Sequence, residues 1–342
     1  MNDFYPPGIG SMPKFEIVAR IDATNVRSLV WDGDSLVDWA GGGNRFELHG
    51  NCFEGSIRHP FEFDAACVSP SGKYAAVYQR LDTKGAVLKN GEFLRELSRS
   101  DYHADVYEYP ICFARLGTGQ EVLIHCPDEY CQLEIEDAET GERLTQHANR
   151  KPVDFFHSRL AVNFAGTYLL SAGWVWQPYD FFGLFNLPEA LVDPVLLDDW
   201  NFVPKVSAEV SSAAFLGDDR LVIATSAETF EDEFTGDEVR PSSIAVWNIT
   251  RQKLMGNVLL EQAAGTLMPV DEEVVVDFFE HPKLVSISTG KVIERLPDVH
   301  SGTQTSSIIH HIEPLPAMAL DPARRRFAIA SESEILVVAV SD

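Results

Sequence analysis

The apolar positions of this chain recur as pairs of short runs separated by a polar turn. In one such unit, residues 66–68 and 74–77 are apolar, and the turn between them reads Ser-Pro-Ser-Gly-Lys. β-Branched and aromatic residues are enriched in strands, whereas Gly, Pro, Asp and Ser favour tight turns. Each unit therefore predicts a β-hairpin with two buried strands and a turn in water. Strong helical periodicity is scarce along the chain.

This hairpin unit recurs seven times. Its turns are centred near residues 32, 70, 117, 165, 217, 271 and 321, and successive turns are 38 to 54 residues apart. A repeat of about 40–50 residues that contains a hairpin is typical of one blade of a β-propeller, in which small sheets pack radially around a channel. The pattern predicts an all-β fold, a seven-bladed β-propeller built of four-stranded sheets.

An outer strand follows most of the hairpins. Such strands lie at residues 133–137, 182–187, 243–249 and 283–287. Two of them lead into the turns Thr140-Gly141-Glu142 and Thr289-Gly290-Lys291. This order of strand, Thr-Gly turn and aliphatic residue resembles the outer strand and turn of WD-repeat propellers, and Trp247-Asn248 stands where that family has its Trp-Asp pair. The resemblance spans the chain from about residue 15. It implies a WD-like propeller, although the Gly-His pair that opens a WD repeat is absent from every unit.

The two ends of the chain supply strands that could close the ring. Residues 14–21 form a strand-like run without a hairpin partner, and residues 334–342 leave room for one strand after the last hairpin. Pairing them in one blade would remove free sheet edges that promote aggregation. We therefore predict a single domain over residues 14–342, closed by pairing of the N- and C-terminal strands, after a disordered lead-in at residues 1–13. Two β-sandwich domains are the alternative, but no Pro-, Gly- or Ser-rich linker divides the chain.

Charge narrows the classes of partner. The chain has 52 acidic and 27 basic residues, for a formal net charge of −25. Nucleic acids and anionic membranes are bound through clustered Lys and Arg, so neither is an expected partner. A field of this sign favours a basic protein or peptide instead. No apolar run approaches the roughly 20 residues that cross a bilayer. We expect a monomer.

The reactive residue types form no recognisable catalytic or metal-binding motif. The cysteines, at positions 52, 67, 112, 126 and 131, show no metal-type pairing, and unpaired thiols indicate the reducing cytoplasm. No phosphate-binding loop, zinc-protease motif or nucleophile elbow is present. The adjacent His310 and His311 would point to opposite faces of a strand. We predict neither a metal nor a cofactor. A propeller enzyme, a hydrolase or lyase with a central-channel site, remains the alternative. The acids of such a site would come from many blades and would leave no linear motif in the sequence.

Two insertions stand out as candidate binding loops, one in the fourth unit at residues 173–181 and one in the fifth at residues 227–240. Their aromatic and acidic members are the candidate partner-binding residues: Trp174, Trp176, Tyr179, Phe181, Glu228, Phe230, Glu231, Asp232, Glu233 and Phe234. Because consecutive blades are neighbours, we expect the two loops to lie side by side. Aromatic side chains surrounded by acids are suited to a basic partner.

Other interpretations of these insertions stay open. Trp174 and Trp176 would share one face of an ordinary strand, and the acids could form a solvated hairpin tip. The long connections between blades, at residues 98–109, 189–205 and 297–316, are expected on the opposite face of the propeller. From the charge and the loop aromatics we predict a non-enzymatic protein- or peptide-binding module, an interaction scaffold that favours a basic partner.

Overall fold

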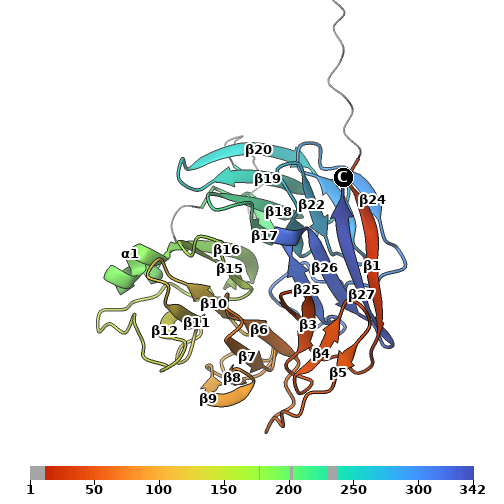
Figure 1. The fold of residues 1–342 in the computed structure, drawn as a ribbon. Coiled ribbons are helices and arrows are strands. Elements are labelled where there is room, and N and C mark those ends of the chain that lie inside the picture. Colours follow the sequence, from red (N-terminus) through yellow and green to blue (C-terminus); the bar gives the residue numbers. More distant parts are fainter. Residues whose placement is uncertain (1–11, 177, 201–202, 230–237) are drawn as a thin grey trace, which may run out of the picture.

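Seven small antiparallel sheets form a ring in the computed structural model, which describes residues 12–176, 178–200, 203–229 and 238–342 (Figure 1). The arrangement is a seven-bladed β-propeller, as the sequence predicts. Each of the seven expected turns joins an inner strand to the next strand of its blade. The first eleven residues of the expected lead-in lie outside the described residues.

The first four blades follow the chain in order. Blade 1 comprises β2 (Val30–Asp32), β3 (Ser35–Asp38), β4 (Asn44–Glu47) and β5 (Cys52–Phe53). Blade 2 comprises β6 (Ala65–Val68), β7 (Tyr74–Tyr78), β8 (Lys84–Lys89) and β9 (Glu92–Ser98). Blade 3 comprises β10 (Ile111–Arg115), β11 (Glu121–His125) and β12 (Glu134–Asp137). Blade 4 comprises β13 (Phe155–Phe156), β14 (Leu160–Val162), β15 (Tyr168–Val175) and β16 (Tyr179–Asn186).

The remaining three blades each have four strands. Blade 5 comprises β17 (Ala208–Phe215), β18 (Arg220–Thr229), β19 (Ser243–Asn248) and β20 (Lys253–Leu259). Blade 6 comprises β21 (Leu267–Pro269), β22 (Val274–Asp277), β23 (Lys283–Ser286) and β24 (Val292–Arg295). Blade 7 comprises β25 (Met318–Asp321), the short 3₁₀ turn η2 (Pro322–Arg324), β26 (Arg326–Ala330), β27 (Glu334–Ser341) and β1 (Lys14–Asp22).

Strand β1 closes the ring by pairing with the last strand, β27, as predicted. The pairing is antiparallel and runs from Lys14 opposite Ser341 to Asp22 opposite Glu334. Phe15 also packs edge-on against Phe327 of β26, with ring centroids 5.9 Å apart. Figure 1 shows β1 beside β27 on the outer side of this blade. The two ends of the chain therefore share one sheet.

Blades 3 and 4 depart from the expected four-stranded form. In the described residues, blade 3 is three-stranded, and in blade 4 both β13 and β14 pair with β15, so they share the position of one inner strand. A helix, α1 (Leu187–Val192), and a 3₁₀ turn, η1 (Pro194–Leu197), follow β16 where a fourth strand would lie. Pro188 and Pro194 favour these helical turns because proline has no amide hydrogen to donate to a sheet.

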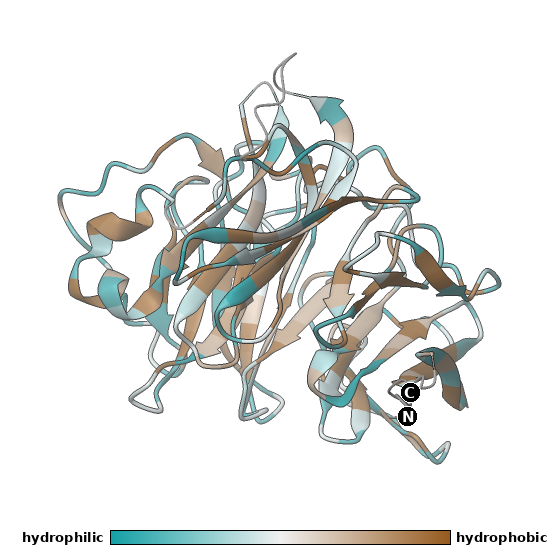
Figure 2. Cartoon of the chain, turned by 90° about the horizontal axis from the view of Figure 1, so that it is seen from above, coloured by the Kyte–Doolittle hydropathy of each residue, from teal (hydrophilic) through white to brown (hydrophobic). Residues whose placement is uncertain are grey.

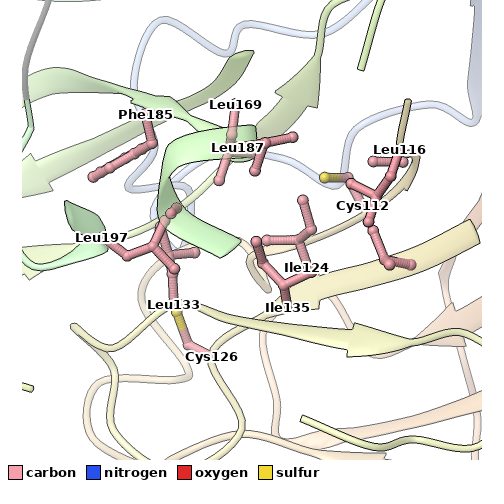
Figure 3. Packing of buried hydrophobic residues seen from close by; sticks show 13 residues of the cluster. Cys112, Leu116, Ile124, Cys126, Leu133, Ile135, Leu169, Phe185, Leu187 and Leu197 are labelled. Carbon is pink, nitrogen blue, oxygen red and sulfur yellow. The ribbon is translucent and has the colours of Figure 1, made fainter. Parts of the chain in front are cut away.

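The apolar core lies mainly between neighbouring blades, and apolar residues concentrate along the strands (Figure 2). Between blades 3 and 4, Ile124 and Ile135 face Leu169 and Phe185, and α1 adds Leu187 (Figure 3). Burying one such side chain contributes roughly 1.5–3 kcal/mol. Helix α1 and the turn η1 thus cover apolar surface that a fourth strand covers in other blades.

One glycine shows how closely the blades approach each other. Gly166 lies in the turn between β14 and β15 with φ at +68°, and a Cβ atom there would come within 2.0 Å of the Arg115 carbonyl oxygen of blade 3. Both the left-handed conformation and the contact between backbones require glycine at this position. No helix in the described part of the chain is long and apolar enough to span a membrane.

Candidate binding face

The hairpin β15–β16 and the connection between blades 2 and 3 lie at the same end of the propeller. Tyr102 and His103 belong to that connection, and the His103 ring lies 5.6 Å from the ring of Trp176 in the hairpin turn. The expectation of opposite faces is therefore wrong. Strands alternate in direction within a blade, so the turn after the second strand and the connection after the fourth both emerge at one end. We call this end the loop face.

Aromatic side chains from blades 3 and 4 and from the connection between blades 2 and 3 gather on the loop face. This aromatic stack comprises Tyr102, His103, Tyr130, Phe156, Trp174 and Trp176. Phe156 is at its centre, with its ring centroid 3.7 Å from that of Trp174 and 4.3 Å from that of Tyr130. The planes of Phe156 and Trp174 differ by only 10°. Stacked pairs of this kind contribute about 0.5–1.5 kcal/mol beyond their buried area.

The stack is buried at its base and open at its edge. Trp174 is 3% exposed, whereas Trp176 is 52% and Tyr102 45% exposed. Trp174 and Trp176 do share one face of the hairpin, with ring centroids 5.6 Å apart. Because Trp174 is covered, it supports the neighbouring rings, and Trp176 and Tyr102 present the accessible aromatic surface.

The other two aromatic candidates of this hairpin lie apart from the stack. Phe181 packs against Phe182 and against Trp200 in the connection to blade 5, with centroids 5.8 and 5.4 Å away. Tyr179 is exposed and opposes Val175 in the strand pairing. The Phe181 ring therefore packs against Trp200, which lies beside the core between blades 3 and 4, and does not join the aromatic stack.

Three carboxylates from the neighbouring hairpins of blades 4 and 5 form an acidic cluster. Its members are Asp180 on β16, Glu209 on β17 and Glu228 on β18. Burial, followed by the charges of Asp180 and Glu228, raises the pKa of Glu209 to about 7. Arg159 and Asp180 act on each other, whereas the two charged groups that act on Glu209 are both acidic. Asp180 opposes Trp174 in the strand pairing, so the cluster lies beside the base of the aromatic stack.

Blades 4 and 5, which hold the two candidate loops, are neighbours in the ring. Strand β17 of blade 5 contacts both β15 and β16 of blade 4. Glu228 is exposed at the end of β18. The remaining candidates of the fifth-blade loop lie outside the described residues: Phe230, Glu231, Asp232, Glu233 and Phe234.

A segment between blades 6 and 7 crosses the loop face. Residues 304–310, which we call the crossing segment, reach the opposite side of the ring, where the Ser307 amide and hydroxyl donate to Asp180 Oδ1 at 2.9 and 2.8 Å. The Ile309 amide donates to the Val106 carbonyl at 3.0 Å, and Ile308 pairs with Tyr107. The segment therefore ties blades 6 and 7 to blade 4 and to the connection between blades 2 and 3.

Two cavities are relevant here, and Ile309 and His310 of the crossing segment line the larger one. The larger, of about 1480 Å³, opens at the loop face among blades 7, 1 and 2, and its lining includes Arg27, Arg80 and His310. The smaller, of about 190 Å³, lies among the inner strands of blades 2, 3 and 4. In the described residues, no three His, Cys, Asp or Glu side chains are arranged to hold a metal ion. His310 and His311 are both exposed, with ring centroids 5.3 Å apart.

No protein-family model matches the chain, and no curated protein has significant similarity to it. The seven-bladed architecture therefore stands on the structure alone. The WD-repeat resemblance of the Thr-Gly turns is supported at the level of the fold and no further.

Several residues of the loop face were not singled out from the sequence. Tyr130 lies in the turn region after β11, and Phe156 lies in a short strand before the expected blade-4 hairpin. Glu209 stands between the buried residues Ala208 and Val210. A charged residue inside a buried run is the sequence signal that could have identified Glu209 as a candidate. These residues meet only because neighbouring blades bring them together.

Proposed function

We propose that this protein is a non-enzymatic protein- or peptide-binding module that takes a basic segment on its loop face. One observation carries the proposal: the acidic cluster, in which burial and the charges of Asp180 and Glu228 raise the pKa of Glu209, lies beside the base of an aromatic stack whose edge is exposed. The five free cysteines are consistent with a reducing cytoplasm, where we place the protein.

The chemistry of this face suits Lys or Arg side chains. Aromatic faces attract cations with about 0.5–2 kcal/mol, and Trp is the strongest of them. A cation near Glu209 would favour the ionised carboxylate and lower its pKa from about 7. Two contacts could therefore stabilise a bound basic segment. One is a cation–π contact with Trp176, and the other reduces the repulsion between carboxylates in the acidic cluster. Binding of this segment should strengthen as pH rises from 6 to 8 because Glu209 must lose its proton.

Calorimetric titration with two synthetic peptides of equal length tests the proposal. One peptide contains Lys at alternate positions, and in the other Glu replaces every Lys. We expect saturable binding of the Lys peptide only, weakening as NaCl screens the charges over roughly 10 Å or less. The double variant Y102A/W176A should bind about tenfold or more weakly, as for truncation of aromatic hot spots.

Phe164→Ala is the matched control for this experiment. Phe164 is 97% exposed but lies in the turn between β14 and β15, at the end of blade 4 opposite to the loop face. The control variant should bind as the wild type does. Equal binding of the Lys and Glu peptides would contradict a basic partner. Equal losses in Y102A/W176A and F164A would contradict the placement of the site on the aromatic stack.

A further inference from the structure

The rings of the aromatic stack lie in nearly parallel planes. The plane of Phe156 differs by 10° from that of Trp174 and by 23° from that of Trp176. On the other side, Tyr102 lies at 20° and Tyr130 at 27° to Phe156. Edge-on packing is the other arrangement that aromatic pairs favour, and it does not occur among these pairs. The shared orientation makes the stack a surface for a planar group.

Trp176 is displaced sideways from the centre of the stack. Directly overlapped rings lie close together, as Phe156 and Trp174 do at 3.7 Å. The centroid of Trp176 instead lies 6.0 Å from that of Phe156 and 5.6 Å from that of Trp174. With planes so nearly parallel, such distances mean that the rings overlap little. Part of the Trp176 face therefore stays uncovered, in agreement with its exposed fraction of 52%.

The connection that packs beside Trp176 is held in place by the protein itself. The ring of His103 in this connection lies 5.6 Å from that of Trp176. The φ angle of His103 is +54°, a left-handed conformation that a residue other than glycine keeps only where its surroundings impose it. The buried Arg99 donates to the Ala104 carbonyl at 2.6 Å, and an amide of the crossing segment donates to the Val106 carbonyl at 3.0 Å. A surface fixed in this way has little conformational entropy to lose on binding.

Exposed carboxylates adjoin this part of the loop face. Asp101 and Asp105 lie in the same turn as His103, and both are exposed. Asp154 is also exposed, and it accepts the hydroxyl of Tyr130 from the stack at 2.8 Å. These acids add to the acidic cluster beside the base of the stack. The rings and the carboxylates together suit a group that is both planar and positively charged.

Arginine and lysine differ in how they meet such a surface. The guanidinium group is planar, weakly hydrated and stacks on aromatic faces, whereas the ammonium group is a compact, strongly hydrated charge. A guanidinium group also pairs with a carboxylate through two parallel hydrogen bonds. We propose that the basic segment is anchored by an arginine side chain, whose guanidinium group stacks on the uncovered face of Trp176, and that lysine is the weaker anchor. This inference rests on the proposed function, because it names the side chain by which that partner is recognised.

Three peptides that differ at one position test the inference. Each has Lys at flanking alternate positions and a central Arg, Lys or citrulline, in which a neutral, planar urea group replaces the guanidinium group. In calorimetric titrations of the wild type, the Arg peptide should bind about fivefold or more tightly than the Lys peptide, as for one cation–π contact at an exposed site. The citrulline peptide should bind more weakly than the Arg peptide because it can stack but carries no central charge.

Two substitutions of Trp176 locate the anchor. Leucine keeps an apolar side chain but has no aromatic face, so the preference for Arg over Lys should disappear in W176L. Phenylalanine keeps an aromatic face, so the preference should persist in W176F. Trp176 is half-exposed, and both variants should fold normally. Phe164→Ala is the matched control, because Phe164 is exposed at the opposite end of blade 4, and it should show the preference of the wild type.

The outcomes separate this inference from the proposed function. Equal affinities of the Arg and Lys peptides for the wild type would overturn the arginine anchor and leave the basic partner standing. Equal affinities of the Arg and citrulline peptides would overturn the anchor as well. A preference for Arg that persists in W176L would contradict its placement on Trp176. If none of the three peptides bound, both the inference and the proposed function would be wrong.

Discussion

Replacing Glu209 by Gln should stabilise the protein above neutral pH and remove part of its pH dependence. In the wild type, burial and the charges of Asp180 and Glu228 raise the pKa of Glu209 from 4.5 to about 7. The native state therefore holds a proton on Glu209 that the unfolded chain releases near pH 4.5. Stability from this group is fully present below that pH and is lost as pH rises through about 7.

The size of the effect follows from the same shift. A change from 4.5 to about 7 corresponds to roughly 3 kcal/mol at pH 8. Glu209 is partly exposed, so solvent screening should reduce this to about 1–2 kcal/mol. Urea unfolding of wild type and E209Q at pH 5 and pH 8, followed by tryptophan fluorescence, measures the difference. We expect E209Q to be more stable at pH 8 by about 1–2 kcal/mol and to gain much less at pH 5.

Glu92→Gln provides the control for net charge. Glu92 is an exposed residue at the start of the outer strand β9, and its replacement removes one negative charge without touching the acidic cluster. The stability difference between pH 5 and pH 8 should be nearly the same in E92Q and the wild type. An equal change in both variants, or a loss of stability in E209Q at pH 8, would refute the reasoning.

Three further predictions can be checked by urea unfolding. Trp174→Ala should cost about 3–5 kcal/mol because its buried ring stacks on the core of the loop face, whereas Trp176→Ala should change stability by less than about 0.5 kcal/mol; equal losses would contradict this. Lys283→Met should cost about 3–5 kcal/mol by leaving the Asp277 carboxylate buried without its ion pair, and D277N/K283M should recover most of that loss; no recovery in the double variant would count against the pair. Burial lowers the pKa of His157 to about 3, so the wild type should lose stability as pH falls below 6.5, and H157Q should lose less over pH 6.5–4, although it is less stable at pH 7; parallel pH curves would exclude this cause.

The ring itself could be predicted because its signals are local and repeated. Turns such as Ser69–Lys73 contain the residues that tight turns require, and they recur at the spacing of a propeller blade. The closure by β1 followed from simple counting, since an unpaired strand remained at each end. The prediction of four successive strands in every blade was wrong for blades 3 and 4. After β16 of blade 4, Pro188 and Pro194 favour helical turns instead of a fourth strand. The regular repeat predicted a strand at this position in spite of the two prolines.

The loop face could be predicted only in part. Trp174 and Trp176 were visible as an aromatic run, but the sequence does not tell which of them is covered by Phe156. Glu209 acquires its raised pKa from Asp180 and Glu228, which belong to two other strands. Such properties depend on which blade ends meet and on the hand of the strands, and no linear pattern encodes them.

The crossing segment limits how this ring could change over time. A propeller whose blades touch only their neighbours can gain a blade by duplication and simply widen. Here the Ser307–Asp180 and Ile309–Val106 hydrogen bonds connect the crossing segment to the far side of the ring. An eighth blade would widen the ring and increase the distance that the segment must span, which would strain or break these hydrogen bonds. These hydrogen bonds therefore favour a ring of seven blades over a wider one.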